Sequence, residues 1–269
     1  MRFGTAGVPN CSKDRSTIGG VKTVRELDLD AMEVQFVRGV KMKVEMAKQV
    51  RDVAEELDVK LSVHAPYYIN LNAEGEKLEA SVERLKKTVE IGSVFAKDVV
   101  FHPGYYLKHS KDVTYRRVRD NLKQIVEFSL ERGVMLRPET TGKPNQFGDL
   151  METLNLCHEL GILPCIDFAH LHARYRSYNS YDEFCKILEM VENLLGKDAL
   201  MRMHMHVSGI DYGLKGEKRH LNLKESDFKY MDLLRALRDF EVDGTIIVES
   251  PNLEEDALML KEAWKTITK

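Results

Sequence analysis

The chain alternates short apolar runs with longer amphipathic segments from its first residues to its last. The short apolar runs have the length and spacing of strands. They predict strands at Arg2–Thr5, Ala31–Phe36, Lys60–Val63, Asp98–Phe101, Val134–Pro138, Leu163–Asp167, Arg202–Val207 and Thr245–Glu249.

Between these runs, apolar residues recur at the spacing of a helix face. This spacing predicts helices over Lys43–Leu57, Glu76–Phe95, Tyr115–Arg132, Asp149–Leu160, Asp182–Leu195, Ser226–Phe240 and Glu254–Thr268. Glycines stand where helices are expected to end, at Gly133, Gly161, Gly196 and Gly244. Ser226 and Asp227 suit a helix start.

Strands that alternate with helices in this way predict a parallel sheet with short crossovers. The strand count fits a fold of the α/β class, a single (β/α)8 TIM barrel over residues 1–269, and an open doubly wound sheet is the alternative. No linker or low-complexity run marks a second domain. The chain lacks GxGxxG and the P-loop pattern, so nothing supports dinucleotide or P-loop chemistry.

The formal net charge is −3, whereas nucleic-acid binders are usually basic. Any DNA binding would therefore depend on a local basic rim or on metal ions, which this count omits. Cys11, Cys157, Cys165 and Cys185 show no CxxC spacing and are interpreted as reduced thiols. No apolar stretch is long enough to span a membrane, and the N-terminus lacks a signal core. We expect a cytoplasmic monomer with no membrane partner.

Side chains with metal-ligand chemistry follow the predicted strands at their carboxyl ends, where TIM barrels place their active sites. They are His64, His102, Glu139, Asp167, His170, His206, His220 and Glu249. Each has an ordinary explanation as a cap or an ion-pair partner, but a barrel aims these ends at one centre. Imidazole with carboxylate suits Zn, Mn or Fe rather than Ca. Because one catalytic zinc needs about three protein ligands, this number of candidates predicts two or three metals, as in phosphoryl hydrolysis.

The remaining histidines are expected to have lesser roles. His204 and His206 alternate on one strand, so both are expected to face the barrel interior, one of them supporting a metal ligand from behind. His172 follows His170 by two residues and flanks the site. His109 and His158 fall on or beside helices and are expected at the surface.

Residues beyond the strand ends could contact a nucleic acid. Tyr67 and Tyr68 follow His64, and a tyrosine there could stack on bases or wedge between them, although such pairs usually pack in a core. Cations in the loops are expected to be solvated, in positions that also allow phosphate contacts. These cations are Arg38, Lys41, Lys43, Arg174 and Arg176.

Several short motifs follow the predicted strands: HAPYYINL beginning at His64, FHPG around His102, ETTGK beginning at Glu139, IDFAH around Asp167 and His170, HVSG beginning at His206, KRH ending at His220 and ESPN beginning at Glu249. Taken together, these motifs resemble those of the endonuclease IV family of apurinic/apyrimidinic endonucleases. Their order and spacing carry the resemblance, which runs from His64 to Pro251. The resemblance implies a (β/α)8 barrel with a cluster of three zinc ions.

The resemblance also implies roles for single residues. His64, His102 and Glu139 would hold one zinc; Glu139, Asp167, His206 and Glu249 a second; His170 and His220 a third. Manganese is the alternative metal. Glu139 would bridge two ions and act as the catalytic residue that orients or deprotonates the water. Tyr67 would enter the minor groove beside the lesion, and Lys41 roughly matches an arginine of a DNA-contacting loop.

The chain departs from the family pattern at the third zinc. Where the family has Asp-Arg-His, this chain has Lys218-Arg219-His220, and a protonated lysine has no lone pair for a metal. Glu217 lies one residue earlier and could replace the missing ligand if the loop is shifted, with Asp211 a remoter substitute. The family also has Asn-Asp where this chain has Ser208-Gly209.

Three functions remain open from the sequence. The resemblance implies a zinc-dependent endonuclease of DNA repair, which hydrolyses the phosphodiester 5′ to abasic sites in double-stranded DNA. The alternative is a sugar isomerase or epimerase of the xylose-isomerase-like superfamily, which needs one ion, two Glu, an Asp and a His. The negative charge and the missing Asp favour this alternative, whereas His64, His102 and His170 favour the nuclease. A DNA-damage binder without turnover is the third possibility.

Overall fold

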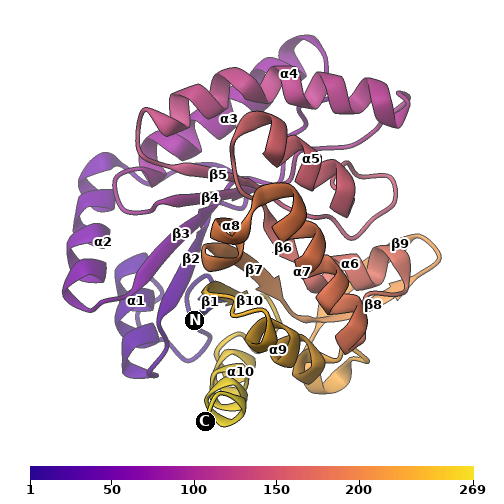
Figure 1. The fold of residues 1–269 in the computed structure, drawn as a ribbon. Helices are drawn as coiled ribbons and strands as arrows, with labels where there is room; N and C mark the ends of the chain where they lie inside the picture. The colour runs from indigo at the N-terminus through magenta and orange to yellow at the C-terminus, as the bar shows by residue number, and fades with distance from the viewer.

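Parallel strands surrounded by helices make up the computed structural model, which describes residues 1–269 (Figure 1). The parallel strands are β1 (Arg2–Ala6), β2 (Ala31–Gln35), β3 (Lys60–His64), β4 (Asp98–Phe101), β5 (Met135–Pro138), β6 (Cys165–Asp167), β7 (Met203–Val207) and β10 (Gly244–Val248). An antiparallel hairpin, β8 (Gly209–Gly213) and β9 (Gly216–Leu221), lies apart from them.

The helices lie outside the sheet, and most of them connect one strand to the next (Figure 1). They are α1 (Thr17–Glu26), α2 (Val44–Glu56), α3 (Gly75–Gly92), α4 (Lys111–Leu130), α5 (Leu150–Leu160), α6 (Phe168–Tyr175), α7 (Tyr181–Leu195), α8 (Lys197–Met201), α9 (Tyr230–Asp239) and α10 (Glu254–Ile267), with a short 3-10 turn, η1, at Leu223–Glu225. None of these helices is both long and apolar enough to cross a membrane.

The strand order establishes a TIM barrel rather than an open doubly wound sheet. The order is β5-β4-β3-β2-β1-β10-β7-β6, so each parallel strand lies beside its neighbour in the chain and the order never reverses at a switch point. The two end strands meet through one parallel bridge between Glu139 and Cys165, where the Thr140 amide donates to the Cys165 carbonyl at 3.1 Å. The predicted (β/α)8 barrel is therefore confirmed.

Local sequence signals explain most element boundaries. α5 begins with a capping box, in which the Asp149 side chain accepts from the Glu152 amide and the Glu152 side chain reaches back. It ends at Gly161, whose φ of 65° is the left-handed conformation that favours glycine. Gly196 likewise follows the end of α7, as predicted.

Three predicted boundaries are wrong. The helix expected from Tyr115 begins at Lys111, because the Ser110 side chain caps it by accepting from the Val113 amide. The helix expected from Ser226 begins at Tyr230, because the Ser226 hydroxyl bonds the backbone of Ile210 in β8 and holds that segment against the hairpin. Gly244 does not end a helix but opens β10, where a Cβ would lie 2.0 Å from the Met203 carbonyl oxygen and no side chain would fit.

The interior of the barrel is partly polar. Apolar side chains fill the layer between strands and helices, as in other TIM barrels. Within the barrel, however, Glu33, Ser62, Arg137, His204 and His206 are all buried. Buried charges need partners, and these residues lead directly to the carboxyl ends of the strands.

Candidate metal centre

The predicted ligands come together at the carboxyl ends of the parallel strands. His64 and Asp167 are the last residues of β3 and β6, and His206 lies in β7. His102, Glu139 and Glu249 each follow directly on β4, β5 and β10. The remaining two, His170 and His220, come from α6 and β9.

Their side-chain atoms form three overlapping groups, each with all ligand atoms within 4.8 Å of one another. The groups are His64, His102 and Glu139; Glu139, Asp167, His206 and Glu249; and Asp167, His170 and His220. Glu139 and Asp167 each belong to two groups. A carboxylate has two oxygens and can join two ions, so this overlap is the arrangement of a multinuclear site.

Glu139 occupies the centre of the cluster. Its Oε2 lies 3.1 Å from His64 Nε2 and 3.0 Å from His102 Nε2, and its Oε1 lies 3.1 Å from His170 Nδ1. The carboxyl group is almost fully buried, at 1% exposure. Glu139 Oε1, Asp167 Oδ2 and both ring nitrogens of His206 are buried without a hydrogen-bond partner, because their close neighbours lie outside hydrogen-bond geometry. Buried polar atoms are normally satisfied, so these orphaned ligand atoms fit a bound cation.

Burial and mutual charge shift the pKa values of the cluster. Burial works to raise the pKa of Glu139, but His102 and His206 outweigh it and hold that pKa well below its usual value. Burial also raises the pKa of Asp167 to about 6, against the pull of His170. The pKa of His170 is raised well above normal, because Asp167 and Glu139 outweigh the effect of burial. Metal binding needs neutral imidazoles, so it would displace protons from this cluster.

Glu217 reaches the third group, and Lys218 turns away from it. Glu217 Oε2 lies 3.6 Å from His170 Nε2, and Glu217 Oε1 lies 3.9 Å from His220 Nε2. Lys218 instead pairs with Asp211 at 3.3 Å. The remoter substitute Asp211 is therefore engaged outside the cluster.

A glycine makes room for this arrangement. A Cβ at Gly142 would lie 2.7 Å from the Glu217 Cβ and 3.0 Å from His170 Cδ2. The Glu217 amide also donates to the Gly142 carbonyl at 3.0 Å, which fixes the start of β9 against this loop. The ETTGK stretch thus supplies both Glu139 and the space that Glu217 occupies.

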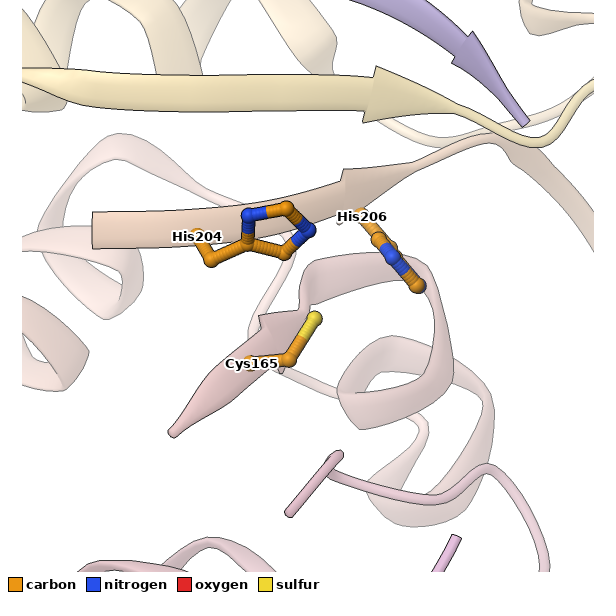
Figure 2. A group of neighbouring side chains, drawn as sticks. All are labelled: Cys165, His204 and His206. Atoms are coloured by element: carbon orange, nitrogen blue, oxygen red, sulfur yellow. The ribbon is translucent and has the colours of Figure 1, made fainter. Parts of the chain in front are cut away.

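Behind the ligands lies a second buried group on β6 and β7. Figure 2 shows His204 and His206 projecting from β7, with the thiol of Cys165 on β6 pointing toward them. These ligand atoms also lie within 4.8 Å of one another. Burial strongly raises the pKa of the Cys165 thiol, which keeps it protonated. His204 Nε2 lies 2.9 Å from Glu33 Oε2, and His206 Nε2 lies 3.0 Å from Glu33 Oε1. Both histidines therefore face the barrel interior, as predicted. Glu33 was not among the predicted site residues.

The cluster lies at the base of an open cavity of about 620 Å³. Tyr67 lines it, 46% exposed, with its ring 5.4 Å from that of His64 and 5.9 Å from that of His102. Arg15 and Lys143 supply positive charge on the cavity wall. Burial, followed by Glu249 and Glu139, raises the Tyr67 pKa, so the phenol stays neutral.

The loop cations differ in their surroundings. Lys41 is exposed in the loop after β2 and does not line the cavity. Arg174 is not a free charge, because its guanidinium donates to the carbonyls of Thr141, Lys143 and Gln146.

The histidines outside the cluster have local partners. His172 is buried, 3.1 Å from Asp227, and therefore flanks the site without joining it. His158 is exposed, as predicted. His109 is only half-exposed, because its Nδ1 contacts Asn72 Oδ1 at 3.1 Å.

A second cavity, of about 670 Å³, opens at the amino ends of the strands. Asp98, Arg137, Lys60 and Arg202 line it. This end of a TIM barrel serves stability rather than chemistry, and it contains none of the predicted ligands. We therefore place the candidate site at the carboxyl end, although the two cavities are similar in size.

Comparisons with known proteins agree with this architecture. The family model for xylose isomerase-like TIM barrels matches residues 21–267, and the chain belongs to this family of enzyme barrels. An uncharacterized protein of Methanocaldococcus jannaschii is 53% identical over 98% of this chain and 97% of its own length. A probable endonuclease 4 of Staphylococcus carnosus is 29% identical over 76% of this chain and 70% of its own.

Solved structures of two activities share the fold. A D-tagatose 3-epimerase-like protein matches with a TM-score of 0.78 at 20% identity, covering 100% of this chain and 97% of its own. Endonuclease IV from Thermus thermophilus matches with a TM-score of 0.75 at 21% identity, covering 99% of this chain and 98% of its own. Similarity at this level establishes the fold, and the choice between the two chemistries depends on the site.

Proposed function

We propose that this chain is a metal-dependent endonuclease that hydrolyses the phosphodiester 5′ to abasic sites in double-stranded DNA and leaves a 3′-hydroxyl. The observation that carries the proposal is the set of three ligand groups joined through Glu139 and Asp167. A one-metal site would use a single group and would leave His64, His102, His170 and His220 without a purpose as ligands. Relatives named as endonucleases support the same conclusion.

The donor set suits two or three zinc ions, with manganese the alternative. We assign His64, His102 and Glu139 to one ion, and Glu139, Asp167, His206 and Glu249 to a second. Asp167, His170, His220 and Glu217 would hold the third, so that Glu217 replaces the aspartate of the family pattern. Such ions activate water and neutralise charge on a phosphate.

The protein side chains supply the rest of the reaction. Glu139, shared by two groups, orients the attacking water. An abasic nucleotide costs little to extrude from the helix, and the open cavity above the cluster can receive it. Tyr67 offers an aromatic face at the mouth of the cavity, where it can stack on bases beside the lesion. Lys41, outside the cavity, could contact a more distant phosphate.

The charge of the chain and its free cysteines bear on how it would attract DNA and where it would act. Because the formal charge is −3, the bound cations and the wall residues Arg15 and Lys143 must attract the DNA locally. The free cysteines fit a reducing compartment such as the cytoplasm, and we expect the enzyme to act as a monomer.

The test is a nicking assay on a duplex with one tetrahydrofuran abasic analogue. Protein stripped of metal and reloaded with zinc or manganese should cut on the 5′ side of the lesion, and a polymerase should extend the new 3′-hydroxyl. An undamaged duplex is the substrate control. Glu139→Gln should abolish cutting, whereas Lys218→Ala, which alters only an exposed ion pair, should retain it. No nick with either metal would refute the proposal.

A sugar epimerase is the second candidate, favoured by the group Glu139, Asp167, His206 and Glu249 and by the epimerase-like fold match. Counting metal ions per chain by elemental analysis separates the two. About one ion per chain indicates the epimerase, and two or three indicate the nuclease. Epimerisation of a ketohexose, with no effect on the abasic duplex, would decide for the epimerase.

A further inference from the structure

Glu33 on β2 is a fully buried carboxylate directly beneath the metal centre. Its Oε2 accepts hydrogen bonds from the Ser62 hydroxyl at 2.9 Å and lies 2.9 Å from His204 Nε2. Its Oε1 accepts from Gln35 Nε2 at 3.1 Å and lies 3.0 Å from His206 Nε2, a close contact outside hydrogen-bond geometry that a small turn of the ring would convert into one. Both oxygens therefore have two polar neighbours each, in an interior that excludes water.

This environment dictates where the protons are. An ionised carboxylate only accepts hydrogen bonds, so each imidazole must present an N–H to it rather than a lone pair. A hydroxyl and a side-chain amide already donate to the same two oxygens. The stable arrangement thus puts protons on the Nε2 atoms of both His204 and His206.

The other nitrogen of His206 faces the predicted ligands. His206 Nδ1 lies 3.6 Å from Glu139 Oε1 and 3.6 Å from Glu249 Oε1. Two ligands of one tetrahedral zinc are separated by roughly 3.4 Å, given metal–ligand bonds of about 2.0–2.2 Å. His206 therefore spans the space between the carboxylate below and the ligand group above.

We propose that Glu33 is a positioning residue for the metal centre, which holds a proton on His206 Nε2 and so commits Nδ1 to the metal. Ring nitrogens of metal-binding histidines are commonly oriented by a carboxylate in this way. His204 occupies the second oxygen of Glu33 and prevents the carboxylate from rotating away from His206. The inference applies to either candidate function, because His206 belongs to the ligand group that both require.

The main test compares metal binding by the full chain and its Glu33→Gln variant. Glutamine keeps the shape but turns an NH2 toward one of the two imidazole N–H groups. We expect zinc affinity, measured by competition with a chromophoric chelator, to fall about 10- to 100-fold for one ion per chain. Asp58→Asn is the control, since it neutralises an exposed carboxylate that pairs with Arg2 outside this network, and its zinc affinity should stay within about threefold of the wild type.

A second measurement needs no variant. In the zinc-loaded wild-type protein, ¹⁵N NMR of the histidine rings should show Nδ1 of His206 bound to metal and Nε2 carrying a slowly exchanging proton. Metal on Nε2, or an unprotonated Nε2, would overturn the proposal. Unchanged zinc affinity in a folded Glu33→Gln variant would overturn it as well.

The outcome is separable from the endonuclease proposal. In the Glu33→Gln variant, half-maximal nicking of the abasic duplex should need more zinc by the same factor as the loss of affinity. A wild-type protein that binds zinc through His206 Nδ1 but cuts no DNA would refute the endonuclease function and leave the role of Glu33 intact.

Discussion

The ion pair between Asp98 and Arg137, at the amino ends of the strands, should make the stability of the barrel depend on acid. Asp98 Oδ1 accepts from Arg137 Nε at 2.6 Å, and its other oxygen lies 3.6 Å from Lys60 Nζ. Burial works to raise the pKa of Asp98, but Arg137, followed by His204 and Lys60, outweighs it and lowers that pKa from 3.8 to about 2. We consider the change Asp98→Asn, which removes the charge and keeps the shape.

The magnitude follows from this lowered pKa. Each pKa unit corresponds to about 1.4 kcal/mol of difference between folded and unfolded states, so ionised Asp98 adds about 2 kcal/mol to the free energy of unfolding. Because the folded pKa is depressed, this contribution is fully present above the unfolded pKa and is lost as pH falls toward the folded value. About half of it should be gone by pH 3.

The assay is urea unfolding of metal-free protein, followed by the fluorescence of the single tryptophan, Trp264. At pH 7 the free energy of unfolding of the wild type should exceed that of Asp98→Asn by about 2 kcal/mol or more, since the variant also leaves Arg137 buried without its partner. This gap should narrow by about 1 kcal/mol at pH 3. A gap that is constant between the two pH values would refute the reasoning. Asp58→Asn is the control, because Asp58 pairs with Arg2 at an exposed position and should cost under about 1 kcal/mol.

The metal centre and its rim allow three more tests. Gly142→Ala should push Glu217 away and lower the number of metal ions bound per chain by one. Lys218→Ala should leave that number unchanged. Equal numbers of ions in both variants would argue against Glu217 as a ligand. Removing metal with a chelator should lower the Tm of the protein, and adding zinc should restore it. An ion at 100 times its Kd stabilises the folded state by about 2.7 kcal/mol. An unchanged Tm would contradict metal binding. Tyr67→Ala should lose a stacking surface worth about 1–3 kcal/mol and raise KM for the abasic duplex roughly tenfold or more, with a smaller change in kcat; an unaltered KM would exclude Tyr67 from the DNA interface.

The strands and most helices are predictable because they depend on periodicity alone. Helix α1 escaped prediction because Gly19 and Gly20 weaken its pattern, glycine being a poor helix former. Packing requires them: a Cβ at Gly19 would lie 2.4 Å from Asp14 atoms, and one at Gly20 would lie 2.9 Å from Val8 and Met32. Tertiary contacts of this kind are not visible in a local sequence window.

The ligand positions were predictable for a related reason. A parallel barrel brings its carboxyl strand ends together whatever the loops do, so His64, His102 and Asp167 could be placed before their distances were known. Glu33 was missed because it lies mid-strand, among the buried residues of β2, and not at a strand end. An acidic residue between two apolar neighbours in a predicted strand was the available signal.

The hairpin β8–β9 could not be anticipated from helix and strand alternation. Its two strands lie outside the barrel repeat, and the sequence suggested only a loop before His220. Whether Glu217 or Lys218 faces the histidines depends on the register of this hairpin, which has an irregularity between Asp211 and Tyr212. That register is fixed by contacts with the distant Gly142 loop, so no local rule reveals it.

Because β5 and β6 are joined by a single bridge, between Glu139 and Cys165, a bound metal would strengthen the closure of the barrel. The β5–β6 junction is the weakest strand pairing of the barrel, and Glu139 and Asp167 lie on its two sides. An ion shared by these two carboxylates would link β5 to β6 across that junction. Metal loading should therefore slow hydrogen exchange most at the Thr140 and Asp167 amides, which donate across the junction to the Cys165 carbonyl and the Thr140 hydroxyl, and chelation should speed exchange there first.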